Sequence, residues 1–236
     1  MKMLNAILMA AGLGKRMLPL TESTPKPLLK VKGESLIETV IDGLKRAGTE
    51  RIFVVSGYLG EQFLPLEKKY EGLKVLNNPY FEKINNISSV YTAREVLKTG
   101  DCLICEADLY LKNRELLSNL PEESCYYGKM IAGHSGDWVF ELDGDGWITR
   151  VGKGGNDCYN MVGLAYFCRK DAELLGHCIE EAFGEPGHED WFWDDVVNRN
   201  LDRLKLKVRP VESDDIYEVD NPGELEALIG RLGGED

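Results

Sequence analysis

AILMAAGLGKRMLPLTESTPKPLL, residues 6–29, is the segment around which the rest of this chain can be interpreted. Its apolar start has the character of a β-strand, and the strand leads into a loop of small residues with two adjacent cations. The residues of this loop are Ala10, Ala11, Gly12, Leu13, Gly14, Lys15 and Arg16. Glycines let backbone N–H groups approach bound phosphates, and the cations offset negative charge. The segment therefore predicts a polyphosphate site at the end of the first strand.

Length and charge narrow the class of protein. The chain has 236 residues, 43% of them hydrophobic, which suits one globular domain with a complete core. Its formal net charge of −12 makes nucleic acid and anionic membranes poor partners, and we expect neither. No run of about 18 apolar residues occurs, so we expect no transmembrane helix. The apolar N-terminus leads into the glycine-rich loop, so we interpret it as a strand rather than a signal peptide.

The six cysteines are scattered, and the one close pair is Cys102 and Cys105 in the strand-like segment DCLICEADLYL. Residues three apart on a strand face opposite sides, so we predict neither a shared metal nor a disulfide for this pair. None of the three histidines has metal-site spacing to another. Buried thiols of this kind fit a reducing compartment, and we expect a cytoplasmic protein.

Strand and helix signals alternate in the first half, which predicts an α/β fold with a mostly parallel sheet. Strands are predicted at 5–9, 51–56, 74–77 and 102–107, and helices at 36–47, 61–70, 88–97 and 113–120. Strand-like segments then follow one another at 126–132, 138–142, 148–151 and 159–167, with later helices at 170–182, 190–198 and 222–232. The run DGDG, 143–146, favours a hairpin turn. We predict a single domain, 1–236, in which 1–120 and a β-rich half, 121–236, form the walls of one cleft.

Two common phosphate-binding motifs do not fit the glycine loop. A dinucleotide fingerprint would need glycine where Met17 stands, and a Walker loop would need G-K-[ST]. The full run, A-A-G-L-G-K-R-M-x-P-L-T-x-x-x-P-K-P-L, closely resembles the opening motif of nucleotidyltransferases that activate phospho-compounds with an NTP. The resemblance implies a Rossmann-like, nucleotide-diphospho-sugar transferase-like fold, with the glycine loop around the triphosphate. It also implies that Lys26, in P-K-P, binds the phosphate of the acceptor.

Two acidic segments are candidate metal ligands. Asp108 lies in E-A-D at the end of a predicted parallel strand, on the side of the sheet where ligands bind. Asp220, in Y-E-V-D-N-P, precedes the last helix and can also simply cap it. In the resembling family one acid of each kind holds Mg²⁺, so the resemblance pairs these two residues. Two carboxylates with phosphate oxygens and waters suit Mg²⁺. Glu218, in the same segment, is grouped with the acceptor-binding candidates.

The segment N-N-I-S-S-V-Y, 85–91, is typical of a helix N-terminus. It also resembles a segment of the bacterial CTP:phosphocholine cytidylyltransferases. By its position in that family it lies beside the nucleoside. The resemblance makes Asn86 and Ser88 candidates for contact with the nucleotide.

The segment E-D-W-F-W-D-D, 189–195, combines two tryptophans with four acids. It can be an amphipathic helix with its aromatic side chains in the core. It can also be a box for an organic cation, since ring faces bind a quaternary ammonium with about 0.5–2 kcal/mol each. The phosphocholine enzymes resemble the chain here too, and the resemblance implies acceptor contacts from Asp190, Trp193, Asp194 and Trp138.

Lys153 is a candidate phosphate contact in the second half. The wider family has a lysine there in an E-K-P context, whereas Gly152 and Gly154 flank this one. An exposed lysine in a glycine turn is the alternative interpretation.

These resemblances together predict a Mg²⁺-dependent cytidylyltransferase that joins CTP and phosphocholine to give CDP-choline and pyrophosphate. Three alternatives stay open. A 2-aminoethylphosphonate or phosphoethanolamine enzyme would bind a primary amine, for which carboxylates matter more than tryptophan faces. A sugar-1-phosphate nucleotidylyltransferase and a nucleotide-binding module without catalysis are the others. No feature of the sequence predicts the oligomeric state.

Overall fold

The structure, a computed structural model, describes residues 3–234 and is built on a seven-stranded sheet with the order β10-β8-β9-β6-β1-β4-β5. The strands are β1 (Leu4–Ala10), β4 (Arg51–Ser56), β5 (Leu73–Asn77), β6 (Asp101–Glu106), β8 (Cys125–Leu142), β9 (Ile148–Phe167) and β10 (Lys207–Pro210). Four neighbouring pairs are parallel, and β9 runs antiparallel to both β6 and β8. The predicted α/β fold with a mostly parallel mixed sheet is therefore confirmed.

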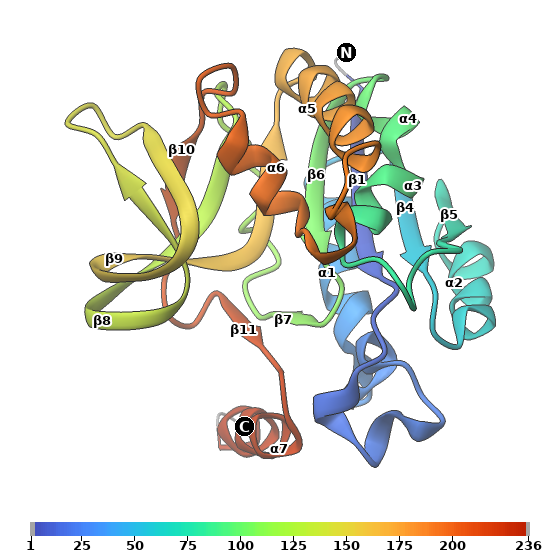
Figure 1. The fold of residues 1–236 in the computed structure, drawn as a ribbon. Helices are drawn as coiled ribbons and strands as arrows, with labels where there is room; N and C mark the ends of the chain where they lie inside the picture. The colour runs from blue at the N-terminus through green and yellow to red at the C-terminus, as the bar shows by residue number, and fades with distance from the viewer. Residues whose placement is uncertain (1–2, 235–236) are drawn as a thin grey trace.

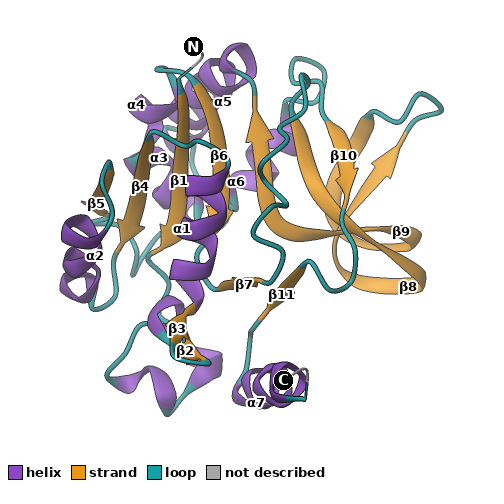
Figure 2. Cartoon of the chain, turned by 180° about the vertical axis from the view of Figure 1, so that it is seen from behind, coloured by secondary structure: helices purple, strands orange, loops and turns teal. Residues whose placement is uncertain are grey.

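Helices cover both faces of this sheet. They are α1 (Leu36–Arg46), α2 (Leu64–Lys69), α3 (Ile87–Thr92), α4 (Arg94–Leu97), α5 (Arg169–Phe183), α6 (Trp193–Arg199) and α7 (Pro222–Gly233). Figure 1 shows α5 and α6 on one face, and Figure 2 shows α1 on the other. Because both faces are covered, almost every residue of β1 is buried, as is usual for parallel strands. Among residues 3–234, no helix combines the length and apolar character needed to cross a membrane.

The two cysteines of β6 lie on opposite faces of the sheet, as predicted. Cys105 packs with Leu103 in the core beneath α1, whereas Cys102 packs with Ile104 in the core beneath α5 and α6. The alternation of side chains along a strand separates the two thiols. All six cysteines of the chain are free.

The second half is dominated by one long, twisted hairpin. The four strands predicted between 126 and 167 merge into two, β8 and β9, which curve away from the rest of the sheet (Figure 1). Shifts of register on β8 between Ile131 and His134, and between Ser135 and Trp138, explain why the sequence suggested separate strands. The predicted turn is present, with the N–H of Gly146 donating to the carbonyl of Asp143.

The helix predicted at 113–120 is absent, and turns take its place. The side chain of Asn113 accepts a hydrogen bond from the N–H of Glu115 and donates one to Asp215, which favours a turn over a helix. The predicted helix at 190–198 begins only at Trp193, after a 3-10 turn, η5 (His188–Asp190). Similarly, 61–70 divides into η4 (Gly60–Phe63) and α2, and 88–97 divides into α3 and α4.

The loop after β1 is held between two other parts of the chain. It contains three 3-10 turns and a small hairpin, namely η1 (Lys15–Met17), η2 (Leu20–Glu22), η3 (Lys26–Leu28), β2 (Lys30–Val31) and β3 (Glu34–Ser35). Met17 packs in a small core with Val219 and Leu228, which brings α7 to this loop (Figure 2). The short strands β7 (Leu109–Leu111) and β11 (Ile216–Glu218) pair with each other, and β11 is followed by α7, which packs on this loop.

Candidate active site

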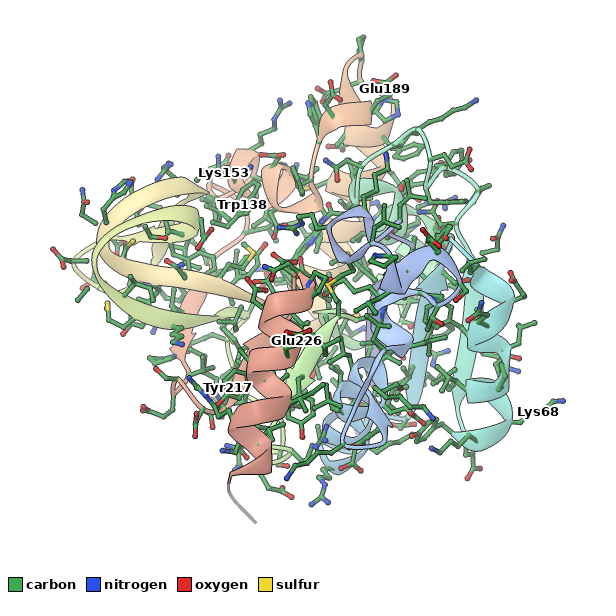
Figure 3. All side chains as sticks on the ribbon, turned by 90° about the horizontal axis from the view of Figure 1, so that it is seen from below. Lys68, Trp138, Lys153, Glu189, Tyr217 and Glu226 are labelled. Carbon is green, nitrogen blue, oxygen red and sulfur yellow. The ribbon has the colours of Figure 1, made fainter. Side chains whose placement is uncertain are left out.

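A cleft of about 940 Å³ opens where β1 and β6 end, and both halves of the chain line it. The glycine loop and the start of α3 contribute from the first half, and the β8–β9 hairpin and the start of α6 contribute from the second. Figure 3 shows Trp138 and Lys153 close together on the hairpin, with Glu189 farther out. The predicted nucleotide and acceptor halves thus face one shared space.

The glycine loop lines the cleft with all of its predicted residues. These are Ala10, Ala11, Gly12, Leu13, Gly14, Lys15 and Arg16. Gly14 has a φ of 61°, and an added Cβ there would lie 3.0 Å from Thr21 Cγ2. The Oγ1 of Thr21 donates to the carbonyl of Gly14 at 2.8 Å and holds this turn. A Cβ added at Gly12 would meet nothing within 4 Å, so that side of the loop has room for a ligand.

Lys26 joins two acids that are far apart in the sequence. Its Nζ lies 2.7 Å from Asp108 Oδ2 and 2.8 Å from Asp220 Oδ1. Burial alone would lower the pKa of Lys26, but the two carboxylates outweigh it and raise that pKa. Arg16 also reaches Asp220, with Nη2 at 2.8 Å from Oδ1, and keeps 73% of its side chain exposed. Lys26 therefore brings Asp108 and Asp220 to the same place in the fold.

Two further acids, Glu218 and Glu106, lie near Lys26 and Asp108. Partial desolvation and the neighbouring carboxylates of Asp220 and Asp108 raise the pKa of Glu218 to about 7. Burial, then Asp108, Glu218 and Asp194, raise the pKa of Glu106. Desolvation opposes ionisation of Asp220, but Lys26 and Arg16 lower its pKa overall. Four carboxyl groups thus lie close to Lys26 and Arg16, and an added cation would favour the charged forms of Glu106 and Glu218.

The residues at this point suit a magnesium ion that is shared with a substrate. Within residues 3–234, no group of three or more His, Cys, Asp and Glu side chains is arranged to hold a metal alone. Mg²⁺ often takes only one or two carboxylates and completes its shell with phosphate oxygens and waters. The pair Asp108 and Asp220 fits that donor set, and its role as metal ligand stays a prediction.

Asn86 and Ser88 both line the cleft at the start of α3. Ser88 is buried, and its hydroxyl donates to the carbonyl of Asn85 at 2.8 Å and accepts from Asn78 Nδ2 at 2.9 Å. The Oδ1 of Asn86 accepts a hydrogen bond from the backbone N–H of Trp193 at 2.9 Å. Both side chains therefore have structural partners, and their contact with a nucleotide stays a prediction.

Two predicted acceptor residues, Trp193 and Asp190, do not line the cleft. Trp193 is only 3% exposed and stacks on Tyr126 with ring centroids 5.6 Å apart. It faces the core because Val196 and Val197, one turn further along α6, are buried on the same side. Asp190 is exposed in the 3-10 turn before α6, outside the cleft lining. Neither side chain therefore faces the cleft in this structure, and a contact of either with the acceptor stays a prediction.

Other residues of the second half of the chain line its side of the cleft. Trp138, predicted from the sequence, contacts the ring of Phe192 edge-on at a centroid distance of 5.3 Å. The Nζ of Lys153 lies 5.9 Å from the centre of the Phe192 ring. Asp194 lines the cleft and accepts a hydrogen bond from the Tyr126 hydroxyl at 3.0 Å. Burial and the nearby Asp195 raise the pKa of Asp194 to about 7, despite that hydrogen bond.

The cleft also contains residues that were not sequence candidates, and three of them have side chains suited to binding an acceptor. They are Phe192, Glu106 and Asp137. Each is adjacent, or next but one, to a residue that was a candidate: Trp193, Asp108 and Trp138. The motifs therefore lie beside the cleft, but tertiary packing decides which of their neighbouring side chains face it.

The fold and the cleft define a class of enzyme. A glycine loop with cations at the end of a parallel strand, facing paired acids, is the arrangement of an α/β nucleotidyltransferase. Residues 6–181 match the MobA-like NTP transferase domain, and the chain belongs to that family.

Relatives extend over nearly the whole chain. A 2-aminoethylphosphonate cytidylyltransferase of Lancefieldella rimae is 52% identical over 224 residues, which are 95% of this chain and 91% of that protein. A choline-phosphate cytidylyltransferase of Streptococcus pneumoniae is 31% identical over 99% of this chain and 100% of its own. The solved structure of the CTP:phosphocholine cytidylyltransferase from that organism has a TM-score of 0.89 and 30% identity, covering 98% of this chain and 100% of its own.

These matches confirm the resemblance found in the sequence motifs. The chain is a nucleotidyltransferase, and its relatives support cytidylyltransferase activity. The acceptor differs between these relatives. The name of the Lancefieldella rimae enzyme specifies 2-aminoethylphosphonate, which the sequence motifs had left open as an alternative acceptor.

Proposed function

We propose that this protein transfers CMP from CTP to 2-aminoethylphosphonate and releases pyrophosphate. The observation that carries this choice is the composition of the acceptor wall. Trp193 packs in the core, whereas Asp194, although also only 3% exposed, borders the cleft together with Glu106. The 52% identity to the 2-aminoethylphosphonate enzyme of Lancefieldella rimae supports the same choice.

A primary ammonium and a quaternary ammonium need different surroundings. The primary group has three N–H donors, so it is best matched by oxygen acceptors. The quaternary group has none and relies on aromatic faces, at about 0.5–2 kcal/mol each. An ammonium beside Asp194 and Glu106 would also favour their charged forms, whose pKa values are raised in the free protein. The acceptor wall thus suits a primary amine.

The reaction needs orientation and charge stabilisation more than proton transfer. A phosphonate oxygen attacks the α-phosphorus of CTP and forms a new P–O bond. The P–O bond to the β-phosphate breaks, and its electron pair leaves with pyrophosphate. The attacking oxygen is already anionic, so no general base and no covalent enzyme intermediate is required.

Different residues of the cleft would orient the substrates and stabilise their charge. Lys26 would orient the phosphonate, and Lys15 and Arg16 would hold the leaving pyrophosphate. Gly12 and Gly14 would let backbone N–H groups approach the triphosphate, with Asn86 and Ser88 on the side of the base. Mg²⁺ at Asp108 and Asp220 would supply stabilisation of the phosphate charge. Glu218 and Lys153 are proposed to border the acceptor and its phosphonate.

The net charge and the cysteines indicate which partners and which compartment suit the protein. The net charge of −12 disfavours nucleic acid as a partner. Six unpaired cysteines fit a reducing compartment, and we propose the cytoplasm.

Phosphocholine is the second candidate acceptor. The edge-on pair of Trp138 and Phe192 favours it, since two aromatic rings remain at the cleft. The Streptococcus pneumoniae enzyme, with a TM-score of 0.89, supports this alternative.

A panel of acceptors distinguishes these possibilities. Pyrophosphate release is measured with CTP and Mg²⁺ and one of four compounds: 2-aminoethylphosphonate, phosphoethanolamine, phosphocholine or glucose 1-phosphate. We expect kcat/KM for 2-aminoethylphosphonate to exceed that for phosphocholine by more than about tenfold, or roughly 1.4 kcal/mol. The opposite preference would overturn the proposal in favour of phosphocholine. UTP in place of CTP is the control for the base, and no turnover with any acceptor would point to a non-catalytic module.

A further inference from the structure

Two consecutive asparagines hold the segment that enters α6. The Oδ1 of Asn86 accepts a hydrogen bond from the N–H of Trp193 at 2.9 Å. The N–H of Asn85 donates to the carbonyl of Glu189 at 2.8 Å, and its Nδ2 donates to the carbonyl of Asp190 at 3.3 Å. Three hydrogen bonds thus attach this segment to the loop before α3.

Asn86 supplies a partner that α6 cannot supply itself. The first four N–H groups of a helix have no acceptor within the helix. A side-chain oxygen at the N-cap normally accepts one of them, but the N-cap residue here is Phe192, which has none. The oxygen of Asn86, from a distant part of the sequence, takes that role for Trp193. Asn86 therefore helps to fix the position of the start of α6, together with the two hydrogen bonds of Asn85.

The two segments joined in this way line different sides of one cleft. Asn86 and Ser88 belong to the wall at the start of α3, and Phe192 and Asp194 belong to the wall at the start of α6. In the proposed function, the nucleotide lies against the first wall and the acceptor against the second. The side chain of Asn86 thus lines the first wall and also bonds the backbone of the helix that carries the second wall.

We infer that Asn86 is a positioning residue that couples the two substrate sites. A nucleotide against α3 restrains the Asn86 side chain, and this restraint holds Phe192 and Asp194 where the acceptor binds. Such coupling is reciprocal, so each substrate tightens the binding of the other. The inference rests on the proposed function and adds to it a route by which the two sites communicate.

Calorimetry on the full chain tests this coupling. 2-Aminoethylphosphonate is titrated with and without saturating α,β-methylene-CTP and Mg²⁺, and the ratio of the two dissociation constants is the coupling factor. We expect a coupling factor of roughly fivefold or more in the wild-type protein, which corresponds to the net free energy of about one hydrogen bond. Asn86→Ala brings the factor close to one. Asn86→Asp keeps an oxygen for the Trp193 N–H and retains most of the factor.

Asn200→Ala is the matched control. The Nδ2 of Asn200 donates to the carbonyl of Val196 at 2.9 Å, so it also contacts α6, but it does not line the cleft. We expect this variant to keep the wild-type coupling factor. A purely structural role for Asn86 would lower the Tm of Asn86→Ala and leave its coupling factor unchanged.

Specific results overturn the inference. One is a wild-type factor of one, and another is an Asn86→Ala factor equal to that of the wild type. If Asn86→Ala does not fold, an Asn86→Asp factor of one has the same meaning. These results leave the proposed function intact as long as the wild-type protein releases pyrophosphate with 2-aminoethylphosphonate. If 2-aminoethylphosphonate neither binds nor reacts, both the inference and the proposed acceptor are wrong.

Discussion

The Nζ of Lys26 lies 2.7 Å from the Oδ2 of Asp108, and the lysine side chain is only 9% exposed. Asp220, just before α7, shares the same ammonium. A buried cation between two carboxylates is held in one place, because moving it would leave buried charges unpaired. Lys26 can therefore present a fixed positive charge to an incoming phosphonate or phosphate.

We expect Lys26→Ala to lower turnover by on the order of 10²-fold or more, because the acceptor loses its orienting charge. The measurement is steady-state pyrophosphate release with CTP. Tm and CTP affinity are measured alongside, because the variant also leaves Asp108 and Asp220 without their shared partner. Near wild-type turnover in the folded variant would exclude the proposed role of Lys26.

Removing one of the paired acids tests the metal site. We expect Asp108→Asn to lower turnover by at least about 10²-fold, with no recovery at high Mg²⁺, because one of two charged ligands is lost. Removal of Mg²⁺ with a chelator from the wild-type protein is expected to stop turnover as well. Asp42→Asn, at an exposed ion pair on α1, is the control and keeps activity. Full activity of the wild-type protein in chelator would contradict the metal proposal.

Asp194 makes stability depend on pH in a defined direction. Its carboxyl ionises near pH 3.8 in an unfolded chain, whereas burial raises its pKa in the fold to about 7. Between these values the folded protein holds a proton that the unfolded chain has released. Asp194 therefore lowers the free energy of unfolding as pH rises from about 4 to about 7.

Asp194→Asn isolates this contribution from those of Glu106 and Glu218. The amide still accepts from the Tyr126 hydroxyl but has no charge to bury, so we expect the variant to gain stability over the wild type as pH rises. Urea unfolding at pH 5 and pH 8 measures the gain, which is expected to be larger at pH 8. A stability difference that does not change with pH would show that Asp194 does not titrate in this range.

The two tryptophans that the sequence grouped together are expected to respond differently. Trp193→Ala removes a buried ring from the core and is expected to destabilise the fold by about 3–5 kcal/mol. Trp138→Ala, at the partly exposed wall of the cleft, is expected to change Tm little and to raise KM for the acceptor. Denaturant unfolding and acceptor kinetics measured on both variants test this contrast. An equal loss of stability in both would contradict the assignment of Trp138 to the cleft.

Much of the fold could be predicted because its signals are local. The continuous apolar run of β1 and the periodicity of α1 depend on nearby residues alone, and both elements formed within a residue or two of their predicted bounds. The segment 113–120 shows the limit of such signals. There Asp215, distant in the sequence, accepts hydrogen bonds from both the N–H and the Nδ2 of Asn113, and a turn forms instead of a helix.

The sequence by itself determined where the glycine loop lies, directly after β1, and that Lys15 and Arg16 belong to it. It determined this because spacing along a strand and its following loop is set by local backbone geometry. Only the tertiary structure decided that Lys26 joins Asp108 to Asp220, and that Phe192 faces the cleft while Trp193 enters the core. Adjacent residues at the start of a helix point in different directions, and the docking of α6 against α3 and β9 selects which of them is buried.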